Sequence, residues 1–472
     1  MKRYEALAAD IAASIHNGTL KPGAKLPSVR RAAVSRHVSP ATVFEAYYLL
    51  EAKGLIHSKN RSGHYVSQAA KALPPEPEAT SRPDGQARPV VIGELVLGIL
   101  ESAMTRDVVP LGSAFPSPLY FPLARLGRAT SAAIADLDPW STVDDLAPGS
   151  NALRQQIALR YLVDGIKIGP EQIVVTNGAM EALNLCLAAV CQPGDTVLVE
   201  SPCFYVCLQA LERLGLHAVE VATDPREGID LAALEAAIVR HRPKACWVMT
   251  NFQNPLGSSM PEAKKQALVE LVTRHRLPLV EDDVYGELYF DNRRPAPTKR
   301  FDREGWVMHC SSFSKTLAPG YRVGWVSPGR FLREVTYQKL TTSLATALPV
   351  QLGIARYLER GSHEKHLREL RLTLRKNRDD YIDAMSRHFP SGTKVSRPAG
   401  GYFLWVEMPE DVDTIALHRT AMDAGISLAP GVMFSASRGF GASVRINYGH
   451  PLTTRVDAAL QTVGRAAMRL SK

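Results

Sequence analysis

Short apolar runs recur through the middle of the chain, and helical stretches separate several of them. Turn residues bound the runs, which cover residues 172–176, 196–200, 245–250, 277–283, 306–312 and 322–326. Strands that alternate with helices usually form a largely parallel sheet that the helices cover. The sequence therefore predicts an α/β fold with a mostly parallel sheet for this part of the chain.

The composition is ordinary for a soluble globular protein, with 45% hydrophobic and 22% charged residues. The length of 472 residues allows about two to four domains. No segment approaches the ~18 apolar residues that span a bilayer, and the first ten residues lack an apolar signal core. The six cysteines contain no CxxC pair and are typical of reduced packing residues. We therefore expect a cytoplasmic protein with no membrane partner and no metal site.

Residues 67–89 separate two parts of different character. They are rich in Pro, Ala, Glu and Ser and show no apolar period, which is typical of a partly extended linker. The sequence thus predicts a small domain at residues 1–66, a linker at 67–89 and a large domain at 90–472. A smaller α/β subdomain is expected at about 335–472, and it includes a long charged helix around residues 363–385.

The N-terminal part holds most of the excess positive charge. Residues 1–66 contain ten Lys and Arg against four Asp and Glu, a net charge of +6 out of +9 for the whole chain. Such a block is either a solvated face or a surface that attracts nucleic-acid phosphates by counterion release. Charge alone does not choose between the two, so the residue pattern must decide.

The pattern in this part is that of three helices followed by a hairpin. Helical apolar spacing marks the first sixteen residues, and residues 26–36 give a short second helix. Ser39 can cap a third helix, with Pro40 in its first position and Gly54 at its end. Two short strands around a basic tip at residues 59–63 follow. In a winged helix-turn-helix of this kind the third helix enters the major groove of double-stranded DNA, and the wing meets the backbone or the minor groove.

This stretch resembles the N-terminal domain of GntR-type bacterial regulators, over its whole length and in its Gly and Pro positions. By family position the expected DNA contacts are Arg30, Ser39, Thr42, Arg61 and Gly63. Many relatives place arginines early in the third helix, where this chain has Pro40, Ala41 and Phe44. The sequence therefore gives less support to direct readout of guanine by arginine. It gives more support to phosphate contacts that position the domain on the DNA.

A second group of residues centres on Lys315, in the segment SSFSKTLAPGYRVGW. A lysine among serines is, on its own, more often solvated than catalytic. Asp282 ends an apolar run, Tyr285 follows it by three residues, and Asn254 lies in the motif NPLG. Pyridoxal 5'-phosphate (PLP) needs an amine for its aldehyde, a carboxylate for its ring nitrogen and donors to its phenolate oxygen. Lys315 would supply the catalytic amine, Asp282 the carboxylate, and Tyr285 and Asn254 the donors.

The phosphate of PLP needs an anion site, and the motif TNGAMEAL offers one. It places Gly178, Ala179 and Met180 at a strand-to-helix turn, where free N–H groups and the helix dipole favour an anion. Hydroxyl groups and a charged fork would complete the site, from Ser312, Ser314 and Arg322.

Two further residues belong to the same set. Phe204 follows an apolar run and either stacks on the cofactor ring or is a core aromatic. Arg445, in SVRINYG, can clamp a substrate carboxylate with both arms of its guanidinium. A buried arginine without such a partner would be costly.

NPLG, EDDVY and SFSK followed by an arginine resemble, in that order, the fold-type I aminotransferases of class I/II, across roughly residues 95–470. The resemblance implies PLP as cofactor and a homodimer with its active site at the subunit interface. Together with the GntR-like part, the chain resembles the MocR subfamily of GntR regulators. Two positions depart from the aminotransferase pattern. Asp144 stands where many have a tyrosine that reaches the phosphate in the partner subunit, and Ala114 stands where glycine is common.

These features suggest two functions. The first is a transcription regulator whose PLP domain, with an amino-acid-like ligand, alters the affinity for DNA. The second is a working aminotransferase with an accessory DNA-binding domain. Arg445 favours the second, because a sensor of cofactor alone has less need of a carboxylate clamp. A structural protein with vestigial sites fits less well, since the set of PLP positions is complete. We expect regulation to be the main role and transamination to be weak or absent.

Overall fold

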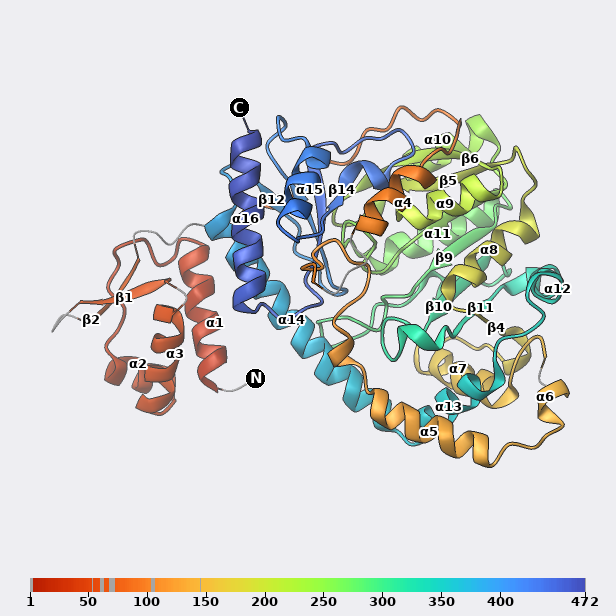
Figure 1. Ribbon diagram of the computed structural model, residues 1–472, viewed down its shortest axis with the longest axis horizontal. Coiled ribbons are helices and arrows are strands. Elements are labelled where there is room, and N and C mark those ends of the chain that lie inside the picture. Colours follow the sequence, from red (N-terminus) through yellow and green to blue (C-terminus); the bar gives the residue numbers. More distant parts are fainter. Residues whose placement is uncertain are drawn as a thin grey trace. The chain divides into compact units, whose positions relative to one another are not determined.

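The computed structural model describes residues 3–52, 54–59, 63–67, 73–102, 107–144 and 146–471. The chain divides into a small unit, formed mainly by residues 1–75, and a large unit (Figure 1). Each unit has a hydrophobic core of its own, as separate domains do.

Among its described residues, the small unit contains three helices and a two-stranded hairpin. They are α1 (Arg3–His16), α2 (Val29–Ser35), α3 (Pro40–Ala52), β1 (Ile56–Lys59) and β2 (Gly63–Val66). Apolar side chains from one face of α1 share a core with Val43 and Leu50 of α3. The Ser39 hydroxyl accepts a hydrogen bond from the Thr42 amide (3.2 Å), so α3 begins with the predicted cap. The predicted winged helix-turn-helix is therefore confirmed.

A sheet of nine strands forms the centre of the large unit. The strands are β3 (Arg88–Pro89), β4 (Val174–Thr176), β5 (Thr196–Ser201), β6 (His217–Asp224), β7 (Gly228–Ile229), β8 (Ala245–Val248), β9 (Leu279–Asp282), β10 (Val307–Ser312) and β11 (Gly324–Ser327). Their order is β3-β6-β5-β8-β9-β10-β11-β4, and β7 pairs with β6. The neighbours from β6 to β10 are parallel, whereas β11 is antiparallel to β10 and β4. The predicted mostly parallel sheet is confirmed, and the six predicted strands lie within two residues of their observed ends.

Helices surround this sheet and bury it in two apolar clusters (Figure 1). The helices are α4 (Gly93–Ser102), α5 (Leu123–Ala135), α6 (Ser141–Asp144), α7 (Asn151–Val163), α8 (Ala179–Val190), α9 (Tyr205–Arg213), α10 (Leu231–His241), α11 (Glu262–Arg274), α12 (Leu332–Thr342) and α13 (Leu348–Glu359). One cluster joins α5, α7 and α13 to β4 and β11. The other joins α10 and α11 to β5, β6 and β8.

The C-terminal part contains the long helix α14 (Ser362–His388) and a second sheet. Its strands are β12 (Lys394–Val395), β13 (Phe403–Glu407), β14 (Ala429–Pro430) and β15 (Ser443–Asn447), in the order β12-β13-β15-β14. All three pairings are antiparallel. Helices α15 (Thr414–Asp423) and α16 (Thr454–Leu470) accompany this sheet, so the expected smaller α/β layer is present.

The segment from Glu76 to Pro89 lies along the large unit, although its composition predicts a linker. The Ser81 amide donates to the Thr223 carbonyl (3.1 Å), and β3 pairs antiparallel with β6. The imidazole of His241 lies 2.9 Å from the Gly85 carbonyl. Backbone hydrogen bonds to an edge strand hold this segment, and apolar periodicity carries no sign of such bonds.

The topology also fixes where a ligand can bind. Strands β5, β8, β9 and β10 are parallel, so their carboxyl ends meet at one edge of the sheet. Ligands of open α/β sheets bind outside this edge. Within the described ranges, none of the helices combines the length and apolarity needed to cross a membrane.

Candidate functional site

Lys315 follows β10 at the carboxyl edge of the sheet. Its Nζ donates to the Ala114 carbonyl (2.9 Å) and lies 4.0 Å from the centre of the Phe115 ring. Burial lowers the pKa of Lys315 to about 7, and the Arg445 guanidinium adds to this effect. A substantial fraction of the amine is therefore neutral and nucleophilic at physiological pH.

Asp282 is the last residue of β9 and is 2% exposed. Burial raises its pKa to about 7, and the neighbouring Asp283 carboxylate adds to the rise, whereas Lys315 opposes it. Its Oδ1 is buried and has no hydrogen-bond partner among the described residues. A buried carboxylate oxygen without a partner is costly, and a cationic ring nitrogen is a group that would satisfy it.

The residues on either side of Asp282 point elsewhere, as strand alternation predicts. The Asp283 carboxylate accepts from the Asn251 side chain (2.9 Å) and contacts His309 (3.3 Å). The Glu281 carboxylate accepts from Thr250 (2.7 Å). Of these three carboxylates, Asp282 is thus the one with a buried oxygen that lacks a partner among the described residues.

Tyr285, Asn254 and Arg445 form a connected group. The Asn254 Nδ2 is 3.5 Å from the Tyr285 hydroxyl, and its Oδ1 accepts from Arg445 Nη1 (3.0 Å). All three side chains are at most 1% exposed. Burial raises the pKa of Tyr285, so its phenol keeps the proton that it can donate.

Arg445 lies on β15 of the second sheet and reaches the same edge. Its Nη2 donates to the carbonyls of Gly112 (2.6 Å) and Ser113 (3.2 Å). Its Nε is buried without a partner among the described residues. Burial lowers the pKa of this guanidinium, although nearby tyrosines oppose the shift. A buried cation with an unused donor can bind a carboxylate.

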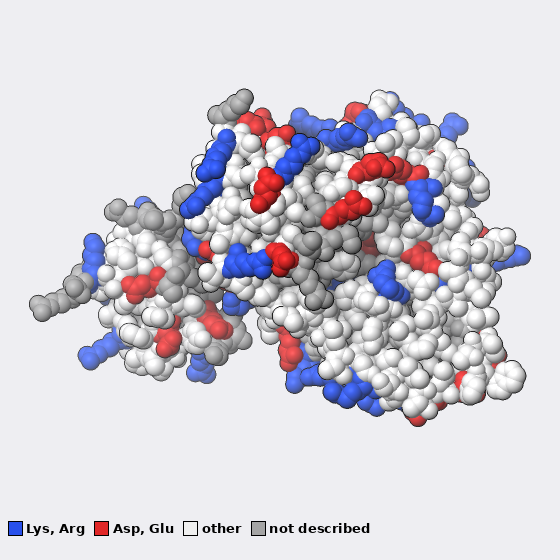
Figure 2. All heavy atoms as spheres, in the orientation of Figure 1, with Lys and Arg blue, Asp and Glu red and all other residues white. Residues whose placement is uncertain are grey.

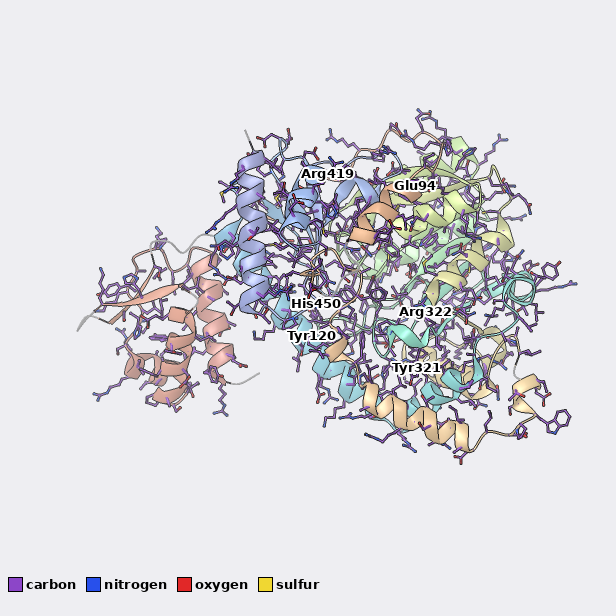
Figure 3. The ribbon with its side chains drawn as sticks, viewed as in Figure 1. Glu94, Tyr120, Tyr321, Arg322, Arg419 and His450 are labelled. Carbon is purple, nitrogen blue, oxygen red and sulfur yellow. The ribbon has the colours of Figure 1, made fainter. Side chains whose placement is uncertain are left out.

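The predicted phosphate ligands gather around the start of α8. Gly178 caps the helix with φ 79° and ψ 171°, and Ala179 and Met180 are in its first turn, whose N–H groups have no acceptor within the helix. Arg322 follows the 3₁₀ turn Pro319–Tyr321; Figure 3 labels it beside Tyr321. Arg322 Nη1 donates to the Ser314 hydroxyl (3.2 Å).

Arg322 packs so closely against the start of this helix that only glycine fits at position 178. A Cβ at Gly178 would lie 2.3 Å from Arg322 Nη2. Ser312 is buried at the end of β10, and its hydroxyl accepts from the Ser314 amide (3.4 Å). The structure thus brings the backbone N–H groups, two hydroxyls and one guanidinium together, which is the donor set of an anion site.

Phe204 precedes α9 and is only partly buried. Its ring lies 4.9 Å from that of Tyr205, a residue adjacent to Arg445 (5.9 Å from ring centre to guanidinium). Phe204 is therefore not a fully buried core aromatic.

Three residues near the site were not among the residues predicted from the sequence. The Phe115 ring covers Lys315, the Tyr402 hydroxyl donates to the Ala114 carbonyl (3.1 Å), and the Asn447 amide donates to the Phe115 carbonyl (2.6 Å). Position alone could have suggested Tyr402 and Asn447, which lie at the ends of strands β13 and β15. The small Ala114 is therefore held by its backbone between Lys315 and Tyr402.

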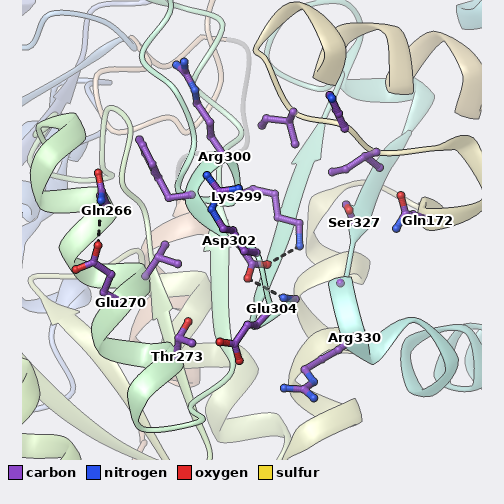
Figure 4. A pocket seen from close by; sticks show the side chains of 18 of the residues that line it. Gln172, Gln266, Glu270, Thr273, Lys299, Arg300, Asp302, Glu304, Ser327 and Arg330 are labelled. Atoms are coloured by element: carbon purple, nitrogen blue, oxygen red, sulfur yellow. Dashed lines mark hydrogen bonds and ion pairs between the residues drawn. The ribbon is translucent and has the colours of Figure 1, made fainter.

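The other aminotransferase departure, Asp144, lies at the exposed end of α6. An open pocket of about 1380 Å³ lies elsewhere, near the amino end of β10 and the C-terminal half of α11 (Figure 4). Its described lining residues include Arg300, Asp302 and Arg330 and none of the predicted site residues.

The predicted DNA contacts lie in the small unit. Arg30, Ser39 and Gly63 are exposed, and Thr42 is partly buried. Arg61 lies outside the described residues.

Comparison with known proteins places both units in families. Residues 3–66 match the bacterial regulatory proteins of the gntR family, and residues 146–462 match aminotransferase class I and II. The chain is 43% identical to the HTH-type transcriptional regulator YdcR of Escherichia coli (strain K12), over 98% of this chain and 99% of that protein. The chain belongs to the MocR type of GntR-family transcription regulators. It is also 38% identical to YjiR of the same organism, over 99% of both chains.

Solved aminotransferases share the fold of this MocR-type regulator. A kynurenine aminotransferase of Pyrococcus horikoshii, in complex with PMP, superposes with a TM-score of 0.74 and 28% identity, over 80% of this chain and 95% of that one. A multiple substrate aminotransferase from Thermococcus profundus gives a TM-score of 0.74 at 26% identity, with the same coverage. The aminotransferase family is PLP-dependent, and the GntR domain is a DNA-binding domain.

Proposed function

We propose that the large unit of this regulator binds PLP, and an amino-acid-like ligand with it, to change the DNA affinity of the small unit. The observation that carries the proposal is Asp282. Its buried oxygen has no partner among the described residues, and it lies at the same edge of the sheet as a lysine whose pKa is lowered to about 7. A pyridinium nitrogen and an aldehyde are the complementary groups.

Each of the other predicted PLP-site residues has a proposed role in binding PLP. Tyr285 and Asn254 would donate to the phenolate oxygen, and Phe204 would stack on the ring. The phosphate would bind to the free N–H groups at the start of α8, to Ser312 and Ser314 and to Arg322, which packs against Gly178. Bound PLP supplies an electron-withdrawing ring that acidifies the Cα–H of an attached amine.

The chain's own groups control the chemistry at this site. Lys315, neutral in part, would bind the cofactor aldehyde, and its Nζ could hold a proton. Asp282 would favour a protonated ring nitrogen, because an anion beside a pyridinium favours the charged form. Arg445 would exchange its carbonyl contacts for a ligand carboxylate and so orient the ligand amine toward Lys315.

A homodimer is part of the proposal. Several large apolar side chains of the large unit are exposed, including Trp140 (72%) and Tyr337 (64%). The surface around α6 carries few charged side chains (Figure 2). A surface with large exposed aromatic residues is typical of a protein–protein interface. Sedimentation should show a dimer that Trp140→Glu weakens.

Regulation requires a thermodynamic link. The ligand must bind one arrangement of the dimer better than another, since a ligand indifferent to both shifts nothing. A coupling of about 1–3 kcal/mol, which is usual, changes DNA affinity about 5- to 150-fold.

Transamination is the second candidate function. Arg445 favours it, because a carboxylate clamp suits an amino-acid substrate. Steady-state assays with a panel of amino donors and common oxo-acids decide between the two functions. We expect little turnover, and robust multiple turnover would make the enzyme the main role.

The cofactor proposal has a direct test. PLP-saturated protein should show a visible absorption band that Lys315→Ala abolishes, while Lys365→Ala, which removes an exposed lysine, should keep it. A saturated wild type without this band would refute the proposal.

A further inference from the structure

The exposed face of helix α3 is apolar where a DNA-reading helix usually is polar. Phe44 is 60% exposed and Tyr48 is 66% exposed, four residues apart on the same side. Ala41 and Pro40, one turn earlier, are exposed as well. The opposite side of α3 supplies Val43, Ala46, Tyr47 and Leu50 to the core of the small unit. The outward residues therefore take no part in packing this domain.

The polar groups at the start of α3 are occupied. The Ser39 hydroxyl accepts from the Thr42 amide (3.2 Å) and is 2.8 Å from the Thr42 hydroxyl. Glu45, on the exposed side, can only accept hydrogen bonds when ionised. The first two turns, PATVFEAY, contain no Arg, Lys, Asn or Gln.

This composition restricts what the helix can recognise in the major groove. Guanine is read there by Arg or Lys and adenine by Asn or Gln, whereas the 5-methyl group of thymine is read by apolar contact. The N-terminal residues of a recognition helix are the ones that reach base edges. Phe44 and Ala41 hold that place here, so the thymine methyl group is the base feature that matches them.

Exposed cations suited to phosphate contacts lie on other elements of the small unit. Arg30 and Arg31 on α2 and Lys59 at the end of β1 are exposed. Arg36 by contrast pairs with Asp10 (3.4 Å). Phosphate contacts of this kind fix the register of the helix on the duplex without reading sequence, which leaves base discrimination to α3.

We infer that helix α3 discriminates its operator by apolar contact of Phe44, assisted by Ala41, with thymine 5-methyl groups in the major groove. Phe44 is thus a specificity-determining residue of the DNA-binding domain. The inference concerns the small unit alone and does not depend on the cofactor proposal.

The test uses full-length protein and duplexes selected by it from a random pool. In a selected duplex each thymine of the major-groove half-site is replaced by uracil, which removes only the methyl group. We expect binding to weaken about fourfold for each contacted thymine, because the free energy of burying one methyl group corresponds to about this factor in the dissociation constant. The salt dependence of binding should not change, because no phosphate contact is lost.

Variants assign the effect to the residue. Phe44→Ala should lose most of the difference between thymine and uracil duplexes, and Phe44→Leu should keep more of it. Val34→Ala, which changes another exposed apolar residue of the small unit (77% exposed), should keep all of it. Circular dichroism should show unchanged folding, because Phe44 is outside the core.

Two results would overturn the inference. One is equal affinity of the wild type for the thymine and uracil duplexes. The other is a Phe44→Ala protein that keeps the full preference for thymine; if that variant instead loses self-association, the apolar face is a protein contact and not a DNA contact.

Discussion

Replacing Gly178 by alanine tests the proposed phosphate site most sharply. The new Cβ would lie 2.3 Å from Arg322 Nη2 and 2.8 Å from its Cζ, so the guanidinium must move. Movement breaks the contact between Arg322 and Ser314 (3.2 Å). The backbone at Gly178, with φ 79° and ψ 171°, is in a region that is essentially restricted to glycine and costs other residues about 1–3 kcal/mol.

The expected loss of PLP affinity results from displacement of the Arg322 guanidinium. A hydrogen bond to a charged group is worth about 1.5–3 kcal/mol, so PLP binding should weaken about 10- to 150-fold. The assay is a PLP titration followed by visible absorbance, with thermal unfolding measured in parallel. Gly194→Ala is the matched control, because Gly194 also has a positive φ (90°) but nothing within 4 Å of an added Cβ. It should lose stability and keep the affinity for PLP. A Gly178→Ala protein that binds PLP within about twofold of the wild type would refute the assigned phosphate site.

Three further predictions concern the same site. The rate of PLP binding should fall about tenfold per pH unit below pH 7 and level off above it, because Lys315, with its pKa lowered to about 7, is protonated in acid. Stopped-flow absorbance measures this rate. A rate independent of pH between 5 and 8 would contradict the prediction. Asp282→Asn should retain PLP but lose the protonated ring nitrogen, which shifts the absorption spectrum and weakens binding about tenfold or more; an unchanged spectrum would show that Asp282 does not face the ring. Arg445→Gln should weaken binding of amino acids about 10- to 100-fold, through loss of a charge-assisted pair, while PLP affinity stays within about threefold; equal losses for both ligands would mean that Arg445 has only a structural role.

Much of the fold could be predicted from the sequence because its strands are short, buried and separated by helices. The observed ends of β5 and β10 lie within one residue of the predicted runs. The common location of the candidate site residues could be predicted for the same reason. Asp282, Asn254 and Lys315 end or follow strands whose carboxyl ends must meet at one edge.

Other features depend on contacts between distant segments, which local patterns do not encode. The Phe115 ring over Lys315 joins residues two hundred positions apart, and the steric restriction at Gly178 exists only because Arg322 packs against it. The segment from Glu76 to Pro89 has the composition of a linker, yet backbone hydrogen bonds attach it to β6. Such bonds leave no trace in the side-chain pattern.

The central claim is that PLP bound at Lys315 controls DNA affinity. The most direct measurement is the dissociation constant of the full-length protein for a selected duplex, with and without saturating PLP, in the wild type and in Lys315→Ala. We predict that PLP changes the wild-type constant by about fivefold or more and leaves the Lys315→Ala constant unchanged. Wild-type constants that are equal with and without PLP, and with PLP plus a panel of amino acids, would contradict this claim.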